Sequence, residues 1–112
     1  MSVYQLLKDQ KTTITTPPSN LVVSPTQGQL NQPSSYQAIT AKVTGTGAVS
    51  ATVQPVVSND LVNWSNFGSA ISLSGTNTAN GNASLQGSFT YWGAIVTAIS
   101  GTGAAVDCLL SA

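Results

Sequence analysis

Charged side chains are scarce in this sequence. Three Lys and Arg residues stand against three Asp and Glu residues, so 5% of the 112-residue chain is charged, whereas soluble domains average about 25%. Histidine, glutamate and arginine are absent. Nucleic-acid binding depends on Lys and Arg side chains that neutralise phosphates, and Lys8, Lys11 and Lys42 are too few to form such a surface. We therefore expect no nucleic-acid partner.

The same scarcity excludes most catalytic and metal-binding chemistry. General acid–base catalysis lacks its usual residues, and a metal site needs clustered His, Cys or carboxylate ligands. The available candidates are scattered, namely Asp9, Asp60, Asp107 and Cys108. A single cysteine also cannot form an internal disulfide. We expect no catalytic residue, no metal and no cofactor.

Long apolar runs are missing as well. No segment approaches the roughly 18 apolar residues of a membrane-spanning helix, and the N-terminus lacks the basic flank and apolar segment of a signal peptide. We expect no membrane contact. Core-forming residues are nevertheless plentiful, because 41% of the chain is hydrophobic. Serine, threonine, asparagine and glutamine take the place of the missing charges.

Residues 1–35 differ in composition from the rest. They contain four of the five prolines and three of the six charged residues, and proline favours extended geometry in its neighbourhood. We expect an extended N-terminal arm, either a disordered polar leader or an arm that orders on another surface. Its apolar content favours the second interpretation. The candidate anchors are Tyr4, Leu6, Leu7, Ile14 and Leu21.

From residue 36 onward, apolar and polar residues alternate. Ile39, Ala41 and Val43 share one face of a half-buried strand, and residues 49–54 repeat the pattern. Gly45-Thr46-Gly47 lies between them, and glycine supplies the positive φ of a tight turn. We predict a β-hairpin over residues 38–57. The similar motif around Gly101-Thr102-Gly103 predicts a second hairpin, through internal repetition or through convergence on a favoured turn.

Further short strand candidates lie between these two segments. Strands at about ten-residue spacing with Gly, Asn and Ser turns are typical of antiparallel sandwiches and barrels, and no segment has a helical period. We predict an all-β fold, an antiparallel β-sandwich over residues 36–112 behind the N-terminal arm. The predicted core is Ile39, Ala41, Val43, Val49, Ala51, Val53, Trp64, Ile71, Leu73, Leu85, Phe89, Ile95, Ile99, Val106, Cys108 and Leu110.

Some residues have both a structural and a chemical interpretation. Cys108 alternates with Asp107, which predicts a buried small hydrophobe, because a nucleophilic cysteine needs a base or cation beside it. Asp60 follows Ser58-Asn59, where short polar side chains initiate turns. Calcium binding by Asp60 would require carbonyl oxygens from the Asn-rich segment 77–82 to converge on it.

The aromatic residues Trp64, Tyr91 and Trp92 can fill a core, form an interface or stack on a sugar. Tyr91 and Trp92 are adjacent, so in a strand their side chains point to opposite faces. One of them is therefore expected outside the core, available to a partner. We take Trp92 as a candidate contact residue.

Several of these motifs together resemble small structural proteins encoded in the virion operons of tailed bacteriophages. The likeness covers residues 38–110 and rests on Gly45-Thr46-Gly47-Ala48, Ser58-Asn59-Asp60 followed by Trp64, Leu73-Ser74-Gly75-Thr76-Asn77, the aromatic pair and residues 96–103. Size and the Pro-rich leader are most similar to the capsid decoration proteins, also called cement or staple proteins, of short-tailed phages. Where that group has Gly after the Asp, this chain has Leu61.

The resemblance implies a non-enzymatic, jelly-roll-like structural protein of the virion. It would be made in the host cytoplasm, bind the outer surface of the assembled capsid and clamp neighbouring subunits of the major capsid protein. The resemblance also implies a homodimer, or a trimer, on a local symmetry axis. An arm with spaced apolar anchors can add strands to a neighbour's sheet edge. The alternative is a receptor- or carbohydrate-binding module of a head fibre or tail fibre.

Overall fold

The computed structural model describes residues 3–18, 21–22, 26–27, 32–33, 36–86 and 91–111. These residues form an all-β structure without an α-helix, and every strand pairing is antiparallel, as predicted. The strands are β1 (Val3–Gln10), β2 (Thr26–Gln27), β3 (Gln32–Pro33), β4 (Tyr36–Ser58), β5 (Ser65–Asn66), β6 (Ile71–Gln86) and β7 (Tyr91–Ser111).

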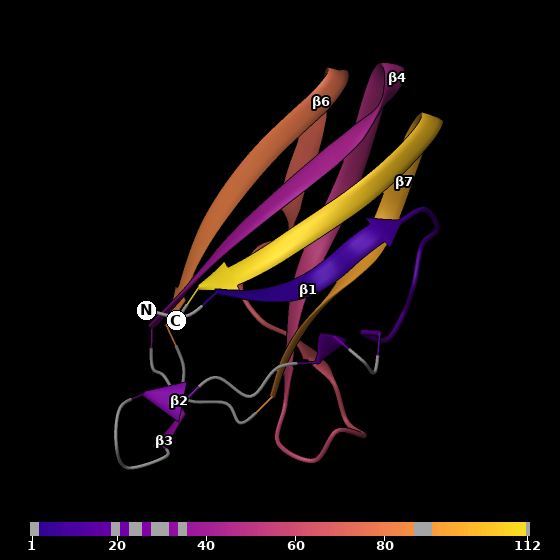
Figure 1. Cartoon of the computed structure of the whole chain (residues 1–112). Coiled ribbons are helices and arrows are strands. Elements are labelled where there is room, and N and C mark those ends of the chain that lie inside the picture. Colours follow the sequence, from indigo (N-terminus) through magenta and orange to yellow (C-terminus); the bar gives the residue numbers. More distant parts are fainter. Residues whose placement is uncertain are drawn as a thin grey trace.

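One sheet contains all the long strands (Figure 1). Strand β4 lies at its centre, with β6 and the short β5 on one side and β7 on the other, and β1 pairs with the C-terminal part of β7. Within the described ranges, strands β2 and β3 pair only with each other. Because β4 contacts both long neighbours over most of its length, it organises the fold.

The Gly-Thr-Gly motifs do not form hairpin turns, so the predicted hairpin over residues 38–57 is wrong. In a hairpin, Thr44 would pair with a residue of its own segment beyond Gly47. Instead β4 continues through the motif and pairs with β6 on both sides of it, Thr44 with Thr78 and Ala48 with Thr76. Strand β7 likewise continues through residues 101–103. Gly47 has a positive φ of 75°, and this backbone geometry forms part of a bend within one strand. Because glycine lacks a Cβ, it adopts positive φ in a bend as readily as in a hairpin turn.

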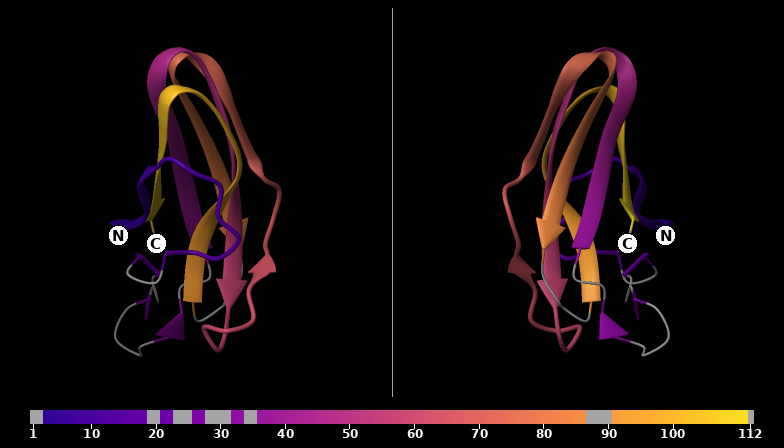
Figure 2. Two further views of the ribbon diagram at one scale, coloured as in Figure 1. Left: turned by 90° about the vertical axis from the view of Figure 1, so that its right-hand side faces the viewer. Right: turned by 90° about the vertical axis from the view of Figure 1, so that its left-hand side faces the viewer.

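The three long strands bend together, so the sheet folds back on itself in two layers (Figures 1 and 2). The first layer holds residues 36–44, 78–86 and 104–111 with β1, and the second holds residues 48–58, 71–76 and 91–100 with β5. Gly81 shows how closely the layers approach, because a Cβ there would lie 2.7 Å from Ile71 Cγ2 and 2.9 Å from Leu73 Cδ2. The more specific description as a jelly-roll-like sandwich stays a prediction.

The hydrophobic core lies between the two layers. The predicted core residues that are buried are Ile39, Ala41, Val43, Val49, Ala51, Val53, Ile71, Leu73, Ile95, Val106, Cys108 and Leu110. Trp64 and Ile99 are only half-buried, and the side chains of Leu85 and Phe89 lie outside the described residues. Buried hydrophobic residues that the sequence did not assign to the core are Leu6, Leu7, Val56, Val57, Trp92, Ala94, Val96, Ala104 and Ala105.

The N-terminal segment belongs to the sheet where the structure describes it, which corrects the division into an arm over residues 1–35 and a separate sheet domain. Strand β1 pairs with β7, and their register shifts between Gln5 and Leu7. At this irregularity the two consecutive side chains of Leu6 and Leu7 are both fully buried. Farther on, the Ile14 N–H donates to the Val96 carbonyl at 3.0 Å. The apolar side chains of this segment thus fill the chain's own core.

Candidate functional site

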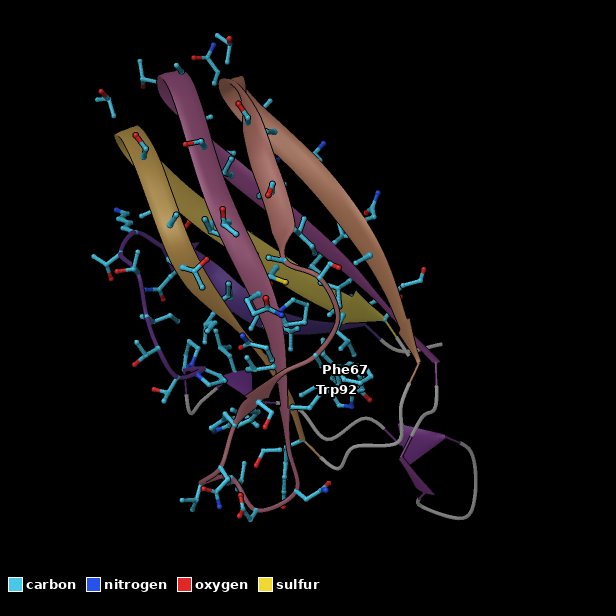
Figure 3. The ribbon with its side chains drawn as sticks, turned by 180° about the vertical axis from the view of Figure 1, so that it is seen from behind. Phe67 and Trp92 are labelled. Atoms are coloured by element: carbon cyan, nitrogen blue, oxygen red, sulfur yellow. The ribbon has the colours of Figure 1, made fainter. Side chains whose placement is uncertain are left out.

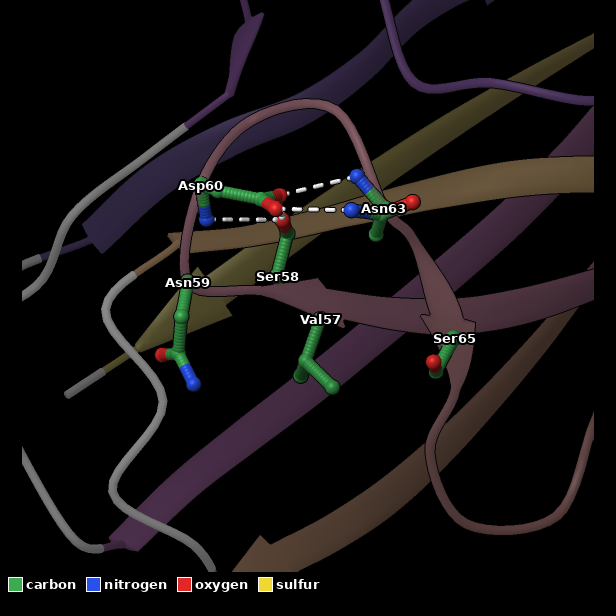
Figure 4. A pocket seen from close by; sticks show the side chains of 6 residues that line it. All are labelled: Val57, Ser58, Asn59, Asp60, Asn63 and Ser65. Carbon is green, nitrogen blue, oxygen red and sulfur yellow. Dashed lines mark hydrogen bonds between the residues drawn. The ribbon is translucent and has the colours of Figure 1, made fainter.

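A compact turn follows the end of β4 and is held together by Ser58 and Asp60 (Figure 4). The Ser58 Oγ accepts the backbone N–H groups of Asp60 at 3.2 Å and Leu61 at 3.0 Å, and donates to Asp60 Oδ1 at 3.0 Å. Asp60 Oδ1 also accepts the backbone N–H groups of Val62 at 2.9 Å and Asn63 at 2.8 Å. The predicted role of this segment in initiating a turn is therefore confirmed.

The hydrogen bonds of this turn also set the charge of Asp60. Donation from the backbone of Asn63 and Val62, followed by the side chains of Asn63 and Ser58, lowers the pKa of the Asp60 carboxyl well below its ordinary value of 3.8. The ionised form is favoured because these donors bind the carboxylate. Asp60 is thus a permanently charged acceptor at neutral pH, and its oxygen atoms are engaged within the loop.

The structure does not bring the possible calcium ligands together. Residues 77–82 belong to β6, and Asn77 lies at the bend, where its Oδ1 accepts the Gly47 N–H at 2.8 Å. The bend is at the end of the molecule opposite the Asp60 turn (Figure 1). Within the described residues, no group of three or more His, Cys, Asp or Glu side chains could hold a metal ion.

The turn presents two apolar side chains, Leu61 and Val62, to solvent. They are 50% and 77% exposed, and we call them the Leu61/Val62 tip. Leu61 has a φ of 64°, in the left-handed region that costs a non-glycine residue about 1–2 kcal/mol. Leu61 therefore has a backbone geometry that suits glycine, and its side chain is not buried.

Two hollows flank this tip. One has a volume of about 350 Å³ and is lined by Thr16, Pro17, Val22, Leu61, Val62 and Trp64. The other has about 240 Å³, and its lining is more polar, from Val57, Ser58, Asn59, Asp60, Asn63 and Ser65 (Figure 4). A mainly apolar groove beside an exposed apolar tip can bury side chains of a partner, and the amides and hydroxyls of the second hollow can donate or accept hydrogen bonds. This combined surface is the candidate functional site.

The residues that the sequence nominated as partner contacts lie elsewhere. Leu6, Leu7 and Trp92 have no exposed surface, so in this conformation they cannot touch a partner, and their assignment is corrected. Trp92 packs edge-on against Phe67, with ring centroids 5.5 Å apart and an interplanar angle of 86° (Figure 3). Burial of a large aromatic side chain in the core explains this placement.

The remaining nominated contacts are half-buried. Tyr4 and Ile14 pack against the core from its margin, and Leu21 is half-buried next to Val22. None of these three side chains lines either hollow. The structure therefore does not gather the nominated residues into one surface.

Cys108 behaves as the sequence predicts. Its side chain is fully buried beside Val106 and Leu110 on the core face of β7. Desolvation by this burial raises the pKa of the Cys108 thiol to about 12. A thiol that stays protonated is a poor nucleophile, so the structural interpretation of Cys108 is confirmed.

Sequence reasoning missed the Leu61/Val62 tip as a candidate contact. The usable signal was local: a leucine directly after the Asp of a turn motif that has glycine in the proteins that the sequence resembles. Comparison of the chain with protein-family models, with curated protein sequences and with solved structures finds no match. In the part of the chain that the structure describes, no helix is long and apolar enough to cross a membrane.

Proposed function

We propose that this protein is a structural component of a bacteriophage virion. In this proposal it binds the outer surface of the assembled capsid and stabilises the capsid by clamping neighbouring subunits of the major capsid protein. The assignment to a phage capsid comes from the motif resemblance described above. A ligand that binds the assembled shell and not the free subunits opposes disassembly by mass action.

The observation that carries the proposal is the Leu61/Val62 tip. A leucine with positive φ and an exposed side chain is unfavourable in the isolated chain on both counts. Backbone outliers of this kind are concentrated at functional sites. Burial of Leu61 and Val62 against a partner would remove apolar surface from water, and the free energy gained would also offset the backbone cost of the positive φ. This supports a protein-binding role for the surface.

The scarcity of charge supports a permanent contact in particular. The candidate site contains one charged side chain, Asp60, which is engaged by its own loop. Contacts made by neutral side chains and backbone respond little to salt, because screening acts on charges. We expect shell occupancy to change little between low and high ionic strength, whereas a steep salt dependence would contradict this part of the proposal.

The carbohydrate-binding alternative loses its main candidate residue. A sugar platform requires an exposed aromatic face, and Trp92 is fully buried. Trp64, which is half-buried and lines the apolar groove, is the aromatic residue of the candidate site on which that alternative now depends. Glycan-array binding that is lost in Trp64→Ala, without affinity for capsids, would favour the alternative.

The proposal is tested by co-sedimentation with shells assembled from the major capsid protein of the same phage. The double variant Leu61→Ser/Val62→Ser removes the apolar tip while its side chains lie outside the core. Each buried apolar side chain contributes about 1.5–3 kcal/mol, so we expect affinity for the shell to fall by at least about tenfold. Deletion of residues 1–35 is not a suitable test, because it removes Leu6 and Leu7 from the core.

The matched control is Val3→Ser/Leu109→Ser, which removes two exposed apolar side chains, 63% and 39% exposed, from the first layer. This variant should bind shells like the wild type. Equal loss in both double variants would show that the tip has no special role. Absence of wild-type binding to any assembled shell would refute the capsid function itself.

A further inference from the structure

The sheet has one long edge without a partner among the described residues, the outer edge of β6. Strand β6 pairs with β4 from Tyr36↔Gln86 to Val53↔Ile71, and no other described strand pairs with it. Figures 1 and 2 show it along one side of both layers. A long unpaired edge presents a row of free N–H and C=O groups, which is a template for strand addition.

The other edges of the sheet are interrupted or covered. Strand β1 forms the opposite edge of the first layer, and it carries Lys8, Asp9 and two register shifts. In the second layer, the Val96 carbonyl of β7 accepts a hydrogen bond from the Ile14 N–H. The pairing of β7 with β4 also has a register shift near Thr97. Charges, bulges and covering segments are the usual protection against edge-to-edge pairing.

Among the described residues, strand β6 has none of these protections. Its sequence, ISLSGTNTANGNASLQ, contains no charged residue and no proline. Its register with β4 is regular except at the bend, where the extra residues belong to β4. The outward side chains are exposed hydroxyls and amides, namely Ser72, Ser74, Thr76, Thr78, Asn80, Asn82 and Ser84. The edge is therefore open for pairing over both of its arms.

We propose that β6 is a self-association edge, which pairs with β6 of a second copy of this chain. The choice of a second copy follows from the chemistry of the edge. Antiparallel self-pairing of this edge brings no charged residues together, and on its outward face it matches only Ser, Thr and Asn, each of which can both donate and accept. Cross-strand Thr and Ser pairs of this kind are favourable. This inference does not depend on the proposed capsid function.

The bend of β6 dictates the symmetry of the pair. Residues 71–76 and 78–86 run in opposite directions in the two layers. A two-fold axis along the long dimension of the molecule, beside this edge, places residues 71–76 next to the partner's residues 78–86 in antiparallel orientation. The same axis gives the reciprocal pairing, as an isologous interface requires. With both bends at one level, Ser74 lies opposite the partner's Asn80, on the outer face of the sheet.

The test uses charge at these two positions. The variant Ser74→Lys/Asn80→Lys places like charges opposite each other twice in the dimer, and each such pair is destabilising. We expect its dimer dissociation constant, measured by analytical ultracentrifugation, to rise about tenfold or more. Mixing this variant with Ser74→Asp/Asn80→Asp should restore dimers, because every contact then joins opposite charges.

The control variant Ser100→Lys/Leu109→Lys adds the same charge on exposed positions of β7. Ser100 is in the same cross-strand row as Ser74, since both pair with Ser50. This control should dimerise like the wild type. A monomeric wild-type protein at millimolar concentration, a dimer that the edge lysines do not weaken more than the control, or a wild-type trimer would each overturn the proposal.

Discussion

The N-terminal strand should contribute a large part of the stability of this protein, and replacing Leu6 and Leu7 by alanine tests this. Both side chains are fully buried and belong to the same cluster as Val106, Cys108 and Leu110. Of the strands that the structure describes, β7 is the only one that pairs with β1. The attachment of β1 therefore depends mainly on one ladder of hydrogen bonds and on these two fully buried side chains, with Tyr4 packing at the margin of the core.

The expected loss follows from the burial of the two leucines. Replacing a fully buried leucine by alanine costs about 2.7–5.0 kcal/mol, through lost transfer free energy and through the cavity left behind. Two adjacent replacements share part of their surroundings and need not be additive. A loss of about 5 kcal/mol or more is expected for Leu6→Ala/Leu7→Ala, comparable with the whole stability of about 5–15 kcal/mol typical of a domain.

Urea unfolding followed by tryptophan fluorescence measures this loss, because Trp92 is buried against Phe67 and reports on the core. The control is Val3→Ala in the same strand, whose side chain is 63% exposed and whose loss should stay within about 0.5 kcal/mol. A double variant with the stability of the control would refute the assignment of β1 to the folded core. The segment would then be a detachable arm after all.

Three further predictions concern single residues. Gly81→Ala should destabilise by about 1–3 kcal/mol in urea unfolding, because its Cβ would meet Ile71 of the opposite layer at 2.7 Å; an unchanged midpoint would contradict the close layer contact. Asp60 has a lowered pKa, so the contribution of its charge to stability is fully present above pH 3.8 and declines as the pH falls below that value towards the pKa of the folded state. The melting-temperature difference between wild type and Asp60→Asn should therefore shrink in acid, and a pH-independent difference would contradict this. Cys108 should resist a thiol reagent in the native state and react fully in denaturant, whereas rapid native labelling would show that it is not buried.

The sequence predicted the strands and much of the core because both depend on local alternation. Ile39, Ala41 and Val43 fall on one face through the period of two, whatever the strand pairs with. Cys108 was predicted to be buried from the same pattern. Such features need no knowledge of distant segments, so they can be obtained from one sequence.

The path of the chain at Gly45-Thr46-Gly47 could not be predicted in this way. A hairpin turn and a bend in a continuous strand both require backbone with positive φ, and glycine provides it in both cases. The outcome is decided by the partner of Thr44, which is Thr78 of β6. That choice depends on long-range pairing, which the local motif does not encode.

The candidate site was missed for a related reason. The leucines near the N-terminus look like anchors for a partner, but Leu6 and Leu7 are buried in the core of their own sheet. Conversely, Leu61 stands where the motif that this turn resembles has glycine, yet its backbone has a φ of 64°. Only the three-dimensional structure distinguishes an apolar residue that is buried within the chain from one that is exposed.

The two proposed surfaces have a joint consequence if both are used. The bend of the sheet and the Leu61/Val62 tip lie at opposite ends of the molecule, whose long dimension is 47 Å (Figure 1). A two-fold axis along this dimension keeps both tips of a dimer at the same end, so both can bind one flat surface. Two linked contacts raise the overall affinity by about 100-fold or more over one contact.

Shell binding by the edge variant Ser74→Lys/Asn80→Lys tests this coupling, because its two tips are unchanged. As a monomer it should lose about 100-fold in apparent affinity for shells, and its mixture with Ser74→Asp/Asn80→Asp should recover the loss. Wild-type affinity of the monomeric variant would show that each tip binds independently. Because the charge-swapped mixture restores the dimer without restoring the original side chains, its recovery would assign the effect to dimerisation and not to contacts of Ser74 or Asn80 with the shell.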